Sequence, residues 1–150
     1  MQLDILKQRI SSIIDGADTK ENKLQAICDY LETKISYYDW VGFYFKNGNK
    51  DELKLAQFTG EPTEHIIIPF GRGICGQVAV SNENFVVQDV SEQDNYISCG
   101  WKVKSEIVIP IFVNGENIGQ IDIDSHTANT FTSKDEELLE YICTKVTRIL

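Results

Sequence analysis

Residues 104–126, KSEIVIPIFVNGENIGQIDIDSH, decide the fold, because they predict two adjacent strands joined by a turn. Successive side chains of a strand point to opposite faces, so Asp122 and Asp124 project together and their isoleucine neighbours project the other way. The same alternation separates Glu106 from the isoleucines of the first strand. One face of this hairpin is therefore expected to be core, and the other carries three acids.

The turn of this hairpin decides which acids face one another. A two-residue loop at 114–115 (Asn-Gly) would place Asp122 opposite a core isoleucine and so mix an acid with the core. A three-residue loop with its glycine in the left-handed conformation, or a bulge near Pro110, which has no ladder donor, would remove the conflict. We expect one of the two, with Glu106 opposite Asp122 and Asp124 on the diagonal.

The spacing of the three acids leaves their setting open. Clustered carboxyl groups repel one another, so at least one should have a raised pKa if the sheet face is covered. A solvent-washed face, on which Asp and Glu are ordinary, is an equally good explanation, because antiparallel sheets often keep one face wet.

The composition suits a single domain, residues 1–150. A chain of this length can bury about two-thirds of its unfolded surface in one core. The formal net charge of -9 argues against a nucleic-acid partner, because no basic patch would face the phosphates. No apolar run approaches the roughly 20 residues that span a bilayer, so we expect a cytoplasmic protein with no membrane contact.

The four cysteines, at 28, 75, 99 and 143, lack the short spacings of a zinc site and are too few for a disulfide scaffold. We therefore expect no bound metal. Cys28 belongs to an apolar stripe of helical spacing and Cys143 borders another, and free cysteine is among the most buried residue types. Both are predicted to be packed and to carry no chemistry.

The other two cysteines are candidates for chemistry. Cys75 follows a glycine-rich turn before a short helix predicted at 77–80, where free amides and the helix dipole would stabilise a thiolate. A packing role for a small residue under the sheet explains Cys75 slightly better. Cys99 lies on a polar loop where Lys102 or Lys104 could lower its pKa, so it is the best candidate nucleophile.

Apolar periodicity places the remaining elements around the hairpin. Helices are predicted at 2–14, at 19–36 and after a capping box at 133–136 (SKDE). A strand rich in aromatic and β-branched residues is predicted at 38–46, further strands at 52–59 and 85–90, and a short extended piece at 66–69. The chain is therefore expected to combine helices with a sheet.

The predicted strand at 38–46 is apolar on both faces, so it should be central in the sheet or covered on both sides. Trp40, Gly42 and Tyr44 share the face that does not carry the phenylalanines. The two rings either pack in an ordinary way or form an aromatic wall beside a small ligand, with Gly42 leaving room between them.

The element order and four segments resemble a GAF domain, an α+β fold in which N- and C-terminal helices pack on one face of a six-stranded antiparallel sheet. The segments are WVGFY at 40–44, PFGRGICG at 69–76, SEIVIP at 105–110 and IDIDS at 121–125. In these segments the chain is similar to the free methionine-(R)-sulfoxide reductases, which are stand-alone GAF enzymes.

The resemblance implies roles for individual residues. Cys99 would be the nucleophile, and Trp40 and Tyr44 would line the pocket for the methyl sulfoxide group. Three acids would bind the free amino acid and its sulfoxide: Glu106, Asp122 and Asp124. A neutral carboxyl, assigned to Glu106, could protonate the sulfoxide oxygen as a general acid.

The implied reaction is thiol-dependent reduction of free L-methionine-(R)-S-oxide to methionine. Cys99 would become a sulfenic acid, a second thiol would condense with it, and an external reductant such as thioredoxin would restore the thiols. No other cofactor is implied. The resemblance leaves the oligomeric state open, with a homodimer as one option.

Two departures from the family pattern leave alternatives open. His65 stands where typical members carry the resolving cysteine, and residues 93–98 (QDNYIS) replace the usual segment before the nucleophile. Either Cys75 resolves Cys99, or an external thiol does, or turnover is lost and only a pocket remains.

The last alternative is a non-catalytic GAF module that binds a small molecule and acts as a sensor with a separate partner. Such sensors usually adjoin an output domain, for which 150 residues leave no room, so we expect the enzyme. A dimerisation module built on the first and last helices would explain the fold but neither the acids nor Cys99.

Overall fold

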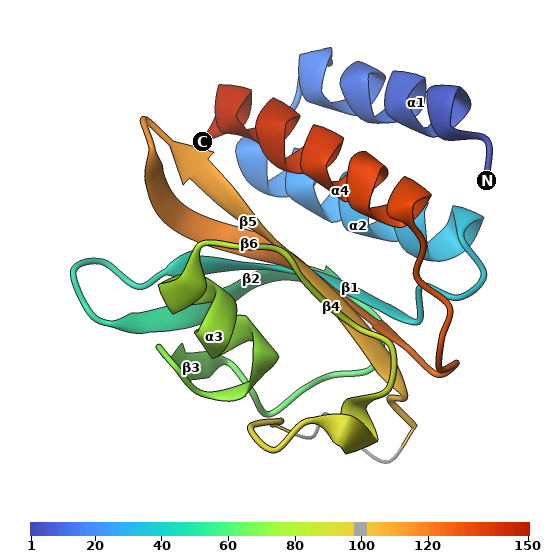
Figure 1. The fold of residues 1–150 in the computed structure, drawn as a ribbon. Coiled ribbons are helices and arrows are strands. Elements are labelled where there is room, and N and C mark those ends of the chain that lie inside the picture. Colours follow the sequence, from blue (N-terminus) through green and yellow to red (C-terminus); the bar gives the residue numbers. More distant parts are fainter. Residues whose placement is uncertain (98–101) are drawn as a thin grey trace.

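The computed structural model describes residues 1–97 and 102–150, which form a curled antiparallel sheet with helices on both sides (Figure 1). Its six strands run in the order β3-β2-β1-β6-β5-β4, and every neighbouring pair is antiparallel. The strands are β1 Trp40–Lys46, β2 Glu52–Thr59, β3 Ile67–Pro69, β4 Phe85–Val87, β5 Ser105–Val113 and β6 Glu116–Ser125. The predicted six-stranded α+β architecture is confirmed.

Three helices lie on one side of the sheet. Helices α2 (Lys20–Lys34) and α4 (Ser133–Val146) pack on the strands, and α1 (Leu3–Asp15) lies outside them (Figure 1). The isoleucines of β5 and β6 and Phe43 of β1 are buried between sheet and helices. Removing this apolar surface from water is the main force that holds the layers together. The predicted apolar face of the hairpin is confirmed.

Helix α3 (Gly73–Ser81) and the connecting loops lie on the opposite side of the sheet (Figure 1). A second apolar cluster joins α3 to this face and includes Trp40 and Tyr44 of β1. Two short 3-10 turns complete the chain, η1 Val90–Glu92 and η2 Thr147–Ile149. Within the described ranges, no helix combines the length and the apolar character needed to cross a membrane.

Two predicted elements have different bounds in the structure. The helix predicted at 77–80 begins four residues earlier, so Cys75 lies within its first turn. Gly73 permits this start, because its φ of 65° is left-handed and favours glycine. The strand predicted at 85–90 ends after three residues, because the Asp89 side chain accepts a backbone N–H two residues on, at 3.0 Å, and starts a turn.

The capping box predicted at 133–136 is wrong by one residue. Thr132 is the N-cap of α4, and its backbone N–H donates to Oδ2 of Asp135 at 2.8 Å. Both registers fit the sequence pattern. The tertiary structure decides between them, because the hydroxyls of Tyr37 and Tyr38 both donate to Oδ1 of Asp135, each at 2.8 Å.

The hairpin between β5 and β6 has a two-residue loop. Asn114 and Gly115 both have positive φ, 52° and 79°, as a type I′ turn requires. The predicted three-residue loop is therefore wrong. The alternative prediction, a β-bulge, is confirmed. It lies just beyond Pro110, where Ile118 is an extra residue on β6.

The bulge sets a register that differs from the expected one. Glu106 pairs with Asp124, whereas Asp122 lies opposite Val108. The expected pairing of Glu106 with Asp122 is wrong because the extra residue belongs to β6, and that pairing needs an extra residue on β5. The three acids nevertheless share one face of the sheet.

Cys28 and Cys143 are buried in the core between the sheet and the helices. The thiol of Cys28 donates to the carbonyl of Gln57 at 3.7 Å, and that of Cys143 to the carbonyl of Ile109 at 3.6 Å. Burial raises the pKa of both thiols, so neither is a ready thiolate. Their predicted packing role is confirmed.

Candidate functional site

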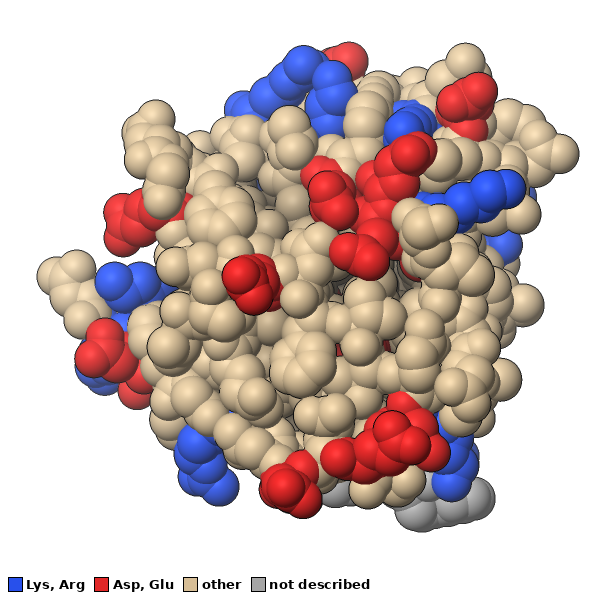
Figure 2. Space-filling model, viewed as in Figure 1, with Lys and Arg blue, Asp and Glu red and all other residues tan. Residues whose placement is uncertain are grey.

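The acids of the hairpin lie beneath the protein surface. Glu106, Asp122 and Asp124 are 4%, 3% and 2% exposed. Figure 2 shows that exposed Lys and Arg side chains are scattered among exposed Asp and Glu over one face of the molecule. The three acids are separate from this mixed surface, so the solvent-washed sheet face is excluded and the acids form a covered cluster.

Burial raises the pKa of Asp122 and raises that of Asp124 further, because Asp124 also experiences the charge of Asp122. The side chains of Glu106 and Cys75 partly offset the effect at Asp122. Oδ1 of each aspartate has no hydrogen-bond partner within the described ranges. These oxygens can therefore bind a ligand that carries hydrogen-bond donors.

Strand β1 supplies an aromatic wall beside the acids. Trp40 pairs with Asp124 across the strands, and the ring centroids of Trp40 and Tyr44 are 6.3 Å apart. A Cβ at Gly42 would lie 2.3 Å from Cη2 of Trp40. Gly42 therefore makes room for the indole itself and leaves no gap between the rings, which corrects our expectation.

The aromatic pair also holds the loop that follows β2. The indole Nε1 of Trp40 donates to the carbonyl of Glu61 at 3.0 Å, and the hydroxyl of Tyr44 donates to the carbonyl of His65 at 2.8 Å. These bonds tie residues 61–65 to the acid-bearing face. The loop thereby becomes part of the wall of a cavity.

Helix α3 brings Cys75 to the acids. Its thiol donates to Oε2 of Glu106 at 3.7 Å and is 5% exposed. Burial and the charges of Asp122, Glu106 and Asp124 raise the pKa of Cys75 well above its ordinary value. The expected stabilisation of its thiolate by the helix start is wrong, because burial and three nearby acids outweigh the dipole.

Two cavities adjoin these residues and share Tyr44 and Asp122. The larger measures about 100 Å³, and the smaller about 20 Å³. The larger is lined by Asp39, Trp40, Tyr44, Glu61, Pro62, Thr63, Lys102, Val103, Asp122, Asp124 and His126. The smaller also reaches Cys75, Glu106 and His65. The structure thus brings the aromatic pair, the three acids and Cys75 together.

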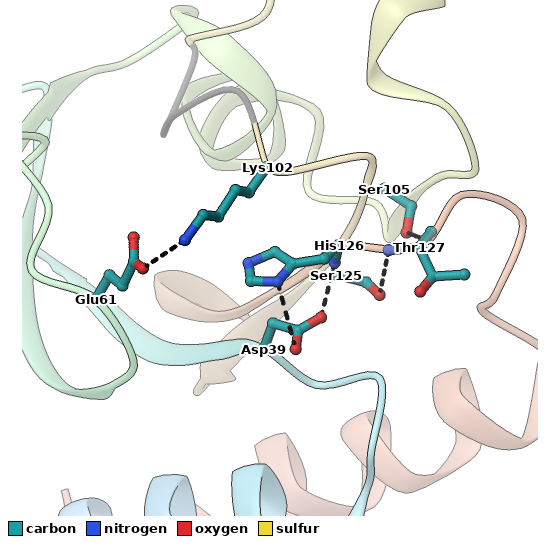
Figure 3. Close-up of polar contacts among 7 residues, drawn as sticks. All are labelled: Asp39, Glu61, Lys102, Ser105, Ser125, His126 and Thr127. Carbon is teal, nitrogen blue, oxygen red and sulfur yellow. Dashed lines mark hydrogen bonds and ion pairs between the residues drawn. The ribbon is translucent and has the colours of Figure 1, made fainter.

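An ion pair and a contact between a histidine and a carboxylate lie at the larger cavity (Figure 3). Nζ of Lys102 is 3.2 Å from Oε1 of Glu61, and Nδ1 of His126 is 3.6 Å from Oδ1 of Asp39. The backbone N–H of His126 also donates to Asp39 at 2.7 Å. Sequence analysis missed these four as cavity residues, because they come from separate segments and share no local pattern.

Hydrogen bonds beyond the strand ends hold this region in place. Oγ of Ser105 donates to the carbonyl of Thr127 at 2.6 Å, and the N–H of Thr127 donates to Ser125 at 3.1 Å (Figure 3). The N–H of Asp39 donates to the carbonyl of Asp124 at 3.0 Å. These bonds fix the ends of β5 and β6 relative to the start of β1.

Two further predictions concern chemistry at this place. Ligand atoms of Cys75, Glu106 and Asp122 all lie within 4.8 Å of one another, a grouping that could hold a metal ion. The expected absence of a metal stays a prediction. Cys99, the predicted nucleophile, lies outside the described residues, so its role also stays a prediction.

Comparison with known proteins adds a family and several relatives. The family model described as GAF domain matches residues 18–150. The chain is 36% identical to Protein YtsP of Bacillus subtilis over 90% of this chain and 82% of the relative. It is 34% identical to free methionine-R-sulfoxide reductase of Escherichia coli over 80% of this chain and 71% of the relative.

This chain is also similar to a solved structure of such a reductase. The free methionine-R-sulfoxide reductase of Neisseria meningitidis, determined in complex with its substrate, superposes with a TM-score of 0.87 at 32% sequence identity. The match covers 98% of this chain and 89% of that one. The similarity therefore extends over almost the whole fold, including both strands of the acidic hairpin.

Proposed function

Because this chain belongs to the GAF domain family and is similar to reductases within it, we propose that it reduces free L-methionine-(R)-S-oxide to methionine. The substrate oxygen passes to a cysteine thiol, which becomes a sulfenic acid. A thioredoxin-type external thiol then restores the enzyme.

The observation that carries the proposal is the covered acid cluster against the aromatic wall. A sulfoxide is a poor electrophile until its oxygen is protonated, so the reaction needs a neutral carboxyl near pH 7. Burial raises the pKa of Asp122 and of Asp124, and the charge of Asp122 raises that of Asp124 further, which favours a shared proton in the cluster. We assign the proton transfer to Glu106, which lies opposite Asp124.

The proposed chemical step is balanced in atoms and electrons. The Cys99 thiolate attacks the sulfoxide sulfur while Glu106 protonates the oxygen. The hydroxyl group then passes from the substrate sulfur to the Cys99 sulfur, so the substrate sulfur–oxygen bond and the bond between the two sulfur atoms break, and Cys99 sulfenic acid and methionine separate. The substrate sulfur is reduced by two electrons, and the Cys99 sulfur is oxidised by two.

The proposed substrate contacts follow from residue type. Asp122 and Asp124 pair with the ammonium group, whose positive charge favours their ionised forms. Trp40 and Tyr44 contact the methyl and methylene groups of the side chain. A methionine sulfoxide within a peptide lacks the free ammonium, so we expect a preference for the free amino acid.

The second thiol is proposed to be Cys75, whose sulfur would bond to that of Cys99 with release of water. Cys75 is buried and its pKa is raised, so its thiolate is scarce and this condensation should be slow. Attack of an external thiol directly on the sulfenic acid is the parallel route.

The test is consumption of the separate R and S epimers of free methionine sulfoxide with dithiothreitol as reductant. We expect wild type to consume only the R epimer and Cys99→Ser to be inactive. Without added thiol, wild type and Cys75→Ser should each be limited to one turnover, after which wild type carries a disulfide between Cys99 and Cys75 whereas Cys75→Ser retains a sulfenic acid that can be trapped by dimedone. Activity retained in Cys99→Ser would contradict the proposed nucleophile. Equal consumption of both epimers would contradict the proposed stereochemistry.

The buried, high-pKa thiol of Cys75 and the histidine at position 65 favour one alternative, a GAF module that binds the amino acid without turning it over. It would act as a sensor with a separate partner. Binding of methionine or its sulfoxide, with no consumption of either epimer, would support this alternative.

A further inference from the structure

We propose that Lys102 binds the α-carboxylate of the amino acid and so determines the specificity of the cavity for free, uncapped amino acids. This inference rests on the proposed function and assigns a residue to a part of the substrate that the acids cannot bind. Lys102 lines the larger cavity in the structure. No sequence pattern marks it as a binding residue.

The charges of the larger cavity fit a zwitterion. Four carboxyl groups line it, those of Asp39, Glu61, Asp122 and Asp124, together with two basic side chains. The two acids of β6 suit an ammonium group, but they would repel a carboxylate. A cation on the same cavity wall would bind the carboxylate of an α-amino acid and offset this repulsion.

Lys102 is the cation best placed for that role. The ammonium and the carboxylate of an α-amino acid share one carbon, so both binding groups must reach into one small cavity, and this one measures about 100 Å³. Val103, the next residue, is 9% exposed and lines the same cavity, which fixes the backbone of Lys102 at its edge. A lysine and a carboxylate form a charge-assisted hydrogen bond.

The other basic residue makes two contacts with one carboxylate. His126 contacts Asp39 through both its ring and its backbone N–H (Figure 3). Lys102 is 3.2 Å from Glu61, and their side chains are 46% and 75% exposed. Exposed ion pairs of this kind contribute little to stability, so a ligand carboxylate can replace Glu61 as the partner of Lys102.

If a ligand carboxylate replaces Glu61 beside Lys102, substitutions of Lys102 and of Glu61 should have opposite effects on binding. Lys102→Met removes the cation and should weaken binding of methionine. Glu61→Gln removes the competing carboxylate and should strengthen it. If the ion pair served only to hold the loop over the cavity, both substitutions would weaken binding.

The experiment is calorimetric titration with L-methionine and with L-methioninamide, which keeps the ammonium but lacks the carboxylate. For Lys102→Met we expect about tenfold weaker binding of methionine, the size of one charged hydrogen bond, and unchanged binding of the amide. For Glu61→Gln we expect binding of methionine to be a few times tighter. Lys104→Met is the matched control, since Lys104 is exposed and does not line the cavity.

Each outcome decides between the proposals. Equal methionine affinity in wild type and Lys102→Met, the same loss in Lys104→Met, or weaker binding in Glu61→Gln would overturn the role of Lys102 alone. Failure of wild type to bind methionine while it still consumes the R epimer of the sulfoxide would overturn this inference alone. Failure both to bind methionine and to consume either epimer would overturn the proposed function and this inference with it.

Discussion

Glu106 of β5 lies directly opposite Asp124 of β6, and both carboxyl side chains are buried. Two like charges in a cross-strand pair destabilise a sheet, and burial adds the cost of removing each charge from water. A proton held within the cluster relieves both effects. At a pH at which the carboxyl groups ionise, this arrangement therefore lowers the free energy of unfolding. Clustered groups with shifted pKa values are typical of functional sites.

The stability of the protein should depend on pH through Asp124. Folding raises its pKa above the ordinary value of 3.8, so above about pH 4 the folded state holds a proton that the unfolded chain has lost. Stability then falls as the pH rises towards the raised pKa. Asp124→Asn removes the charge, and we expect it to stabilise the protein by about 1 to 2 kcal/mol at pH 8 and by little at pH 4.5.

Thermal unfolding measured from pH 4.5 to pH 8 checks this prediction. A gain of 1 kcal/mol corresponds to roughly 2 to 4 °C in Tm for a chain of this size. Asp51→Asn, at an exposed position, is the control and should shift Tm equally little at every pH. A lower Tm for Asp124→Asn than for wild type at pH 8 would contradict the prediction.

The described thiols should resist alkylation in the native state. Cys28, Cys75 and Cys143 are buried, and each has a raised pKa, whereas iodoacetamide reacts with accessible thiolates. In Cys99→Ser protein we expect all three to react at pH 8 more than about 100-fold slower than in the unfolded chain. Mass spectrometry of peptides after timed labelling measures this, and rapid native labelling of Cys75 would refute its assignment as buried.

Gly42 should be essential for the aromatic wall. An alanine Cβ would lie 2.3 Å from the Trp40 ring, so Gly42→Ala must displace the indole at a cost of about 1 to 3 kcal/mol, as other overpacking substitutions do. We expect weaker binding of methionine as well, since Trp40 lines the cavity. Urea unfolding and calorimetric titration measure the two effects.

Gly16→Ala is the control for this substitution. Its Cβ would lie no closer than 3.3 Å to its neighbours, and Gly16 follows α1, away from the cavity. A Gly42→Ala variant with wild-type stability and affinity would show that the ring of Trp40 can move freely.

Asp135 should stabilise the fold without affecting the cavity. It is fully buried and accepts hydrogen bonds from Tyr37, Tyr38 and Thr132 on the helical side of the sheet. Asp135→Ala should cost about 2 to 4 kcal/mol, because it removes a helix cap and leaves two hydroxyls without their acceptor. Urea unfolding measures the loss, and methionine affinity below the transition should be unchanged.

The two tyrosines provide a graded comparison for Asp135. Tyr38 is 1% exposed, whereas Tyr37 is only half-buried, so Tyr38→Phe should cost more than Tyr37→Phe. Equal losses would mean that the burial of the hydroxyl does not set its contribution.

The sequence by itself determined which side chains of the hairpin share a face. Alternation is a property of every extended strand, so Glu106, Asp122 and Asp124 could be grouped, and separated from the isoleucines, without knowledge of the fold. The aromatic character of β1 and the apolar stripes of the helices could likewise be recognised from neighbouring residues in the sequence. The six-stranded fold followed from the resemblance that these segments carry.

Only the tertiary structure decided the register, the state of Cys75 and the contact between Lys102 and Glu61. A bulge is possible on either strand, and in the structure the extra residue, Ile118, lies on β6. The pKa of Cys75 depends on acids that are distant in sequence. Glu61 and Lys102 meet because two loops fold over one sheet face, and contacts between distant segments leave no periodic pattern in a sequence.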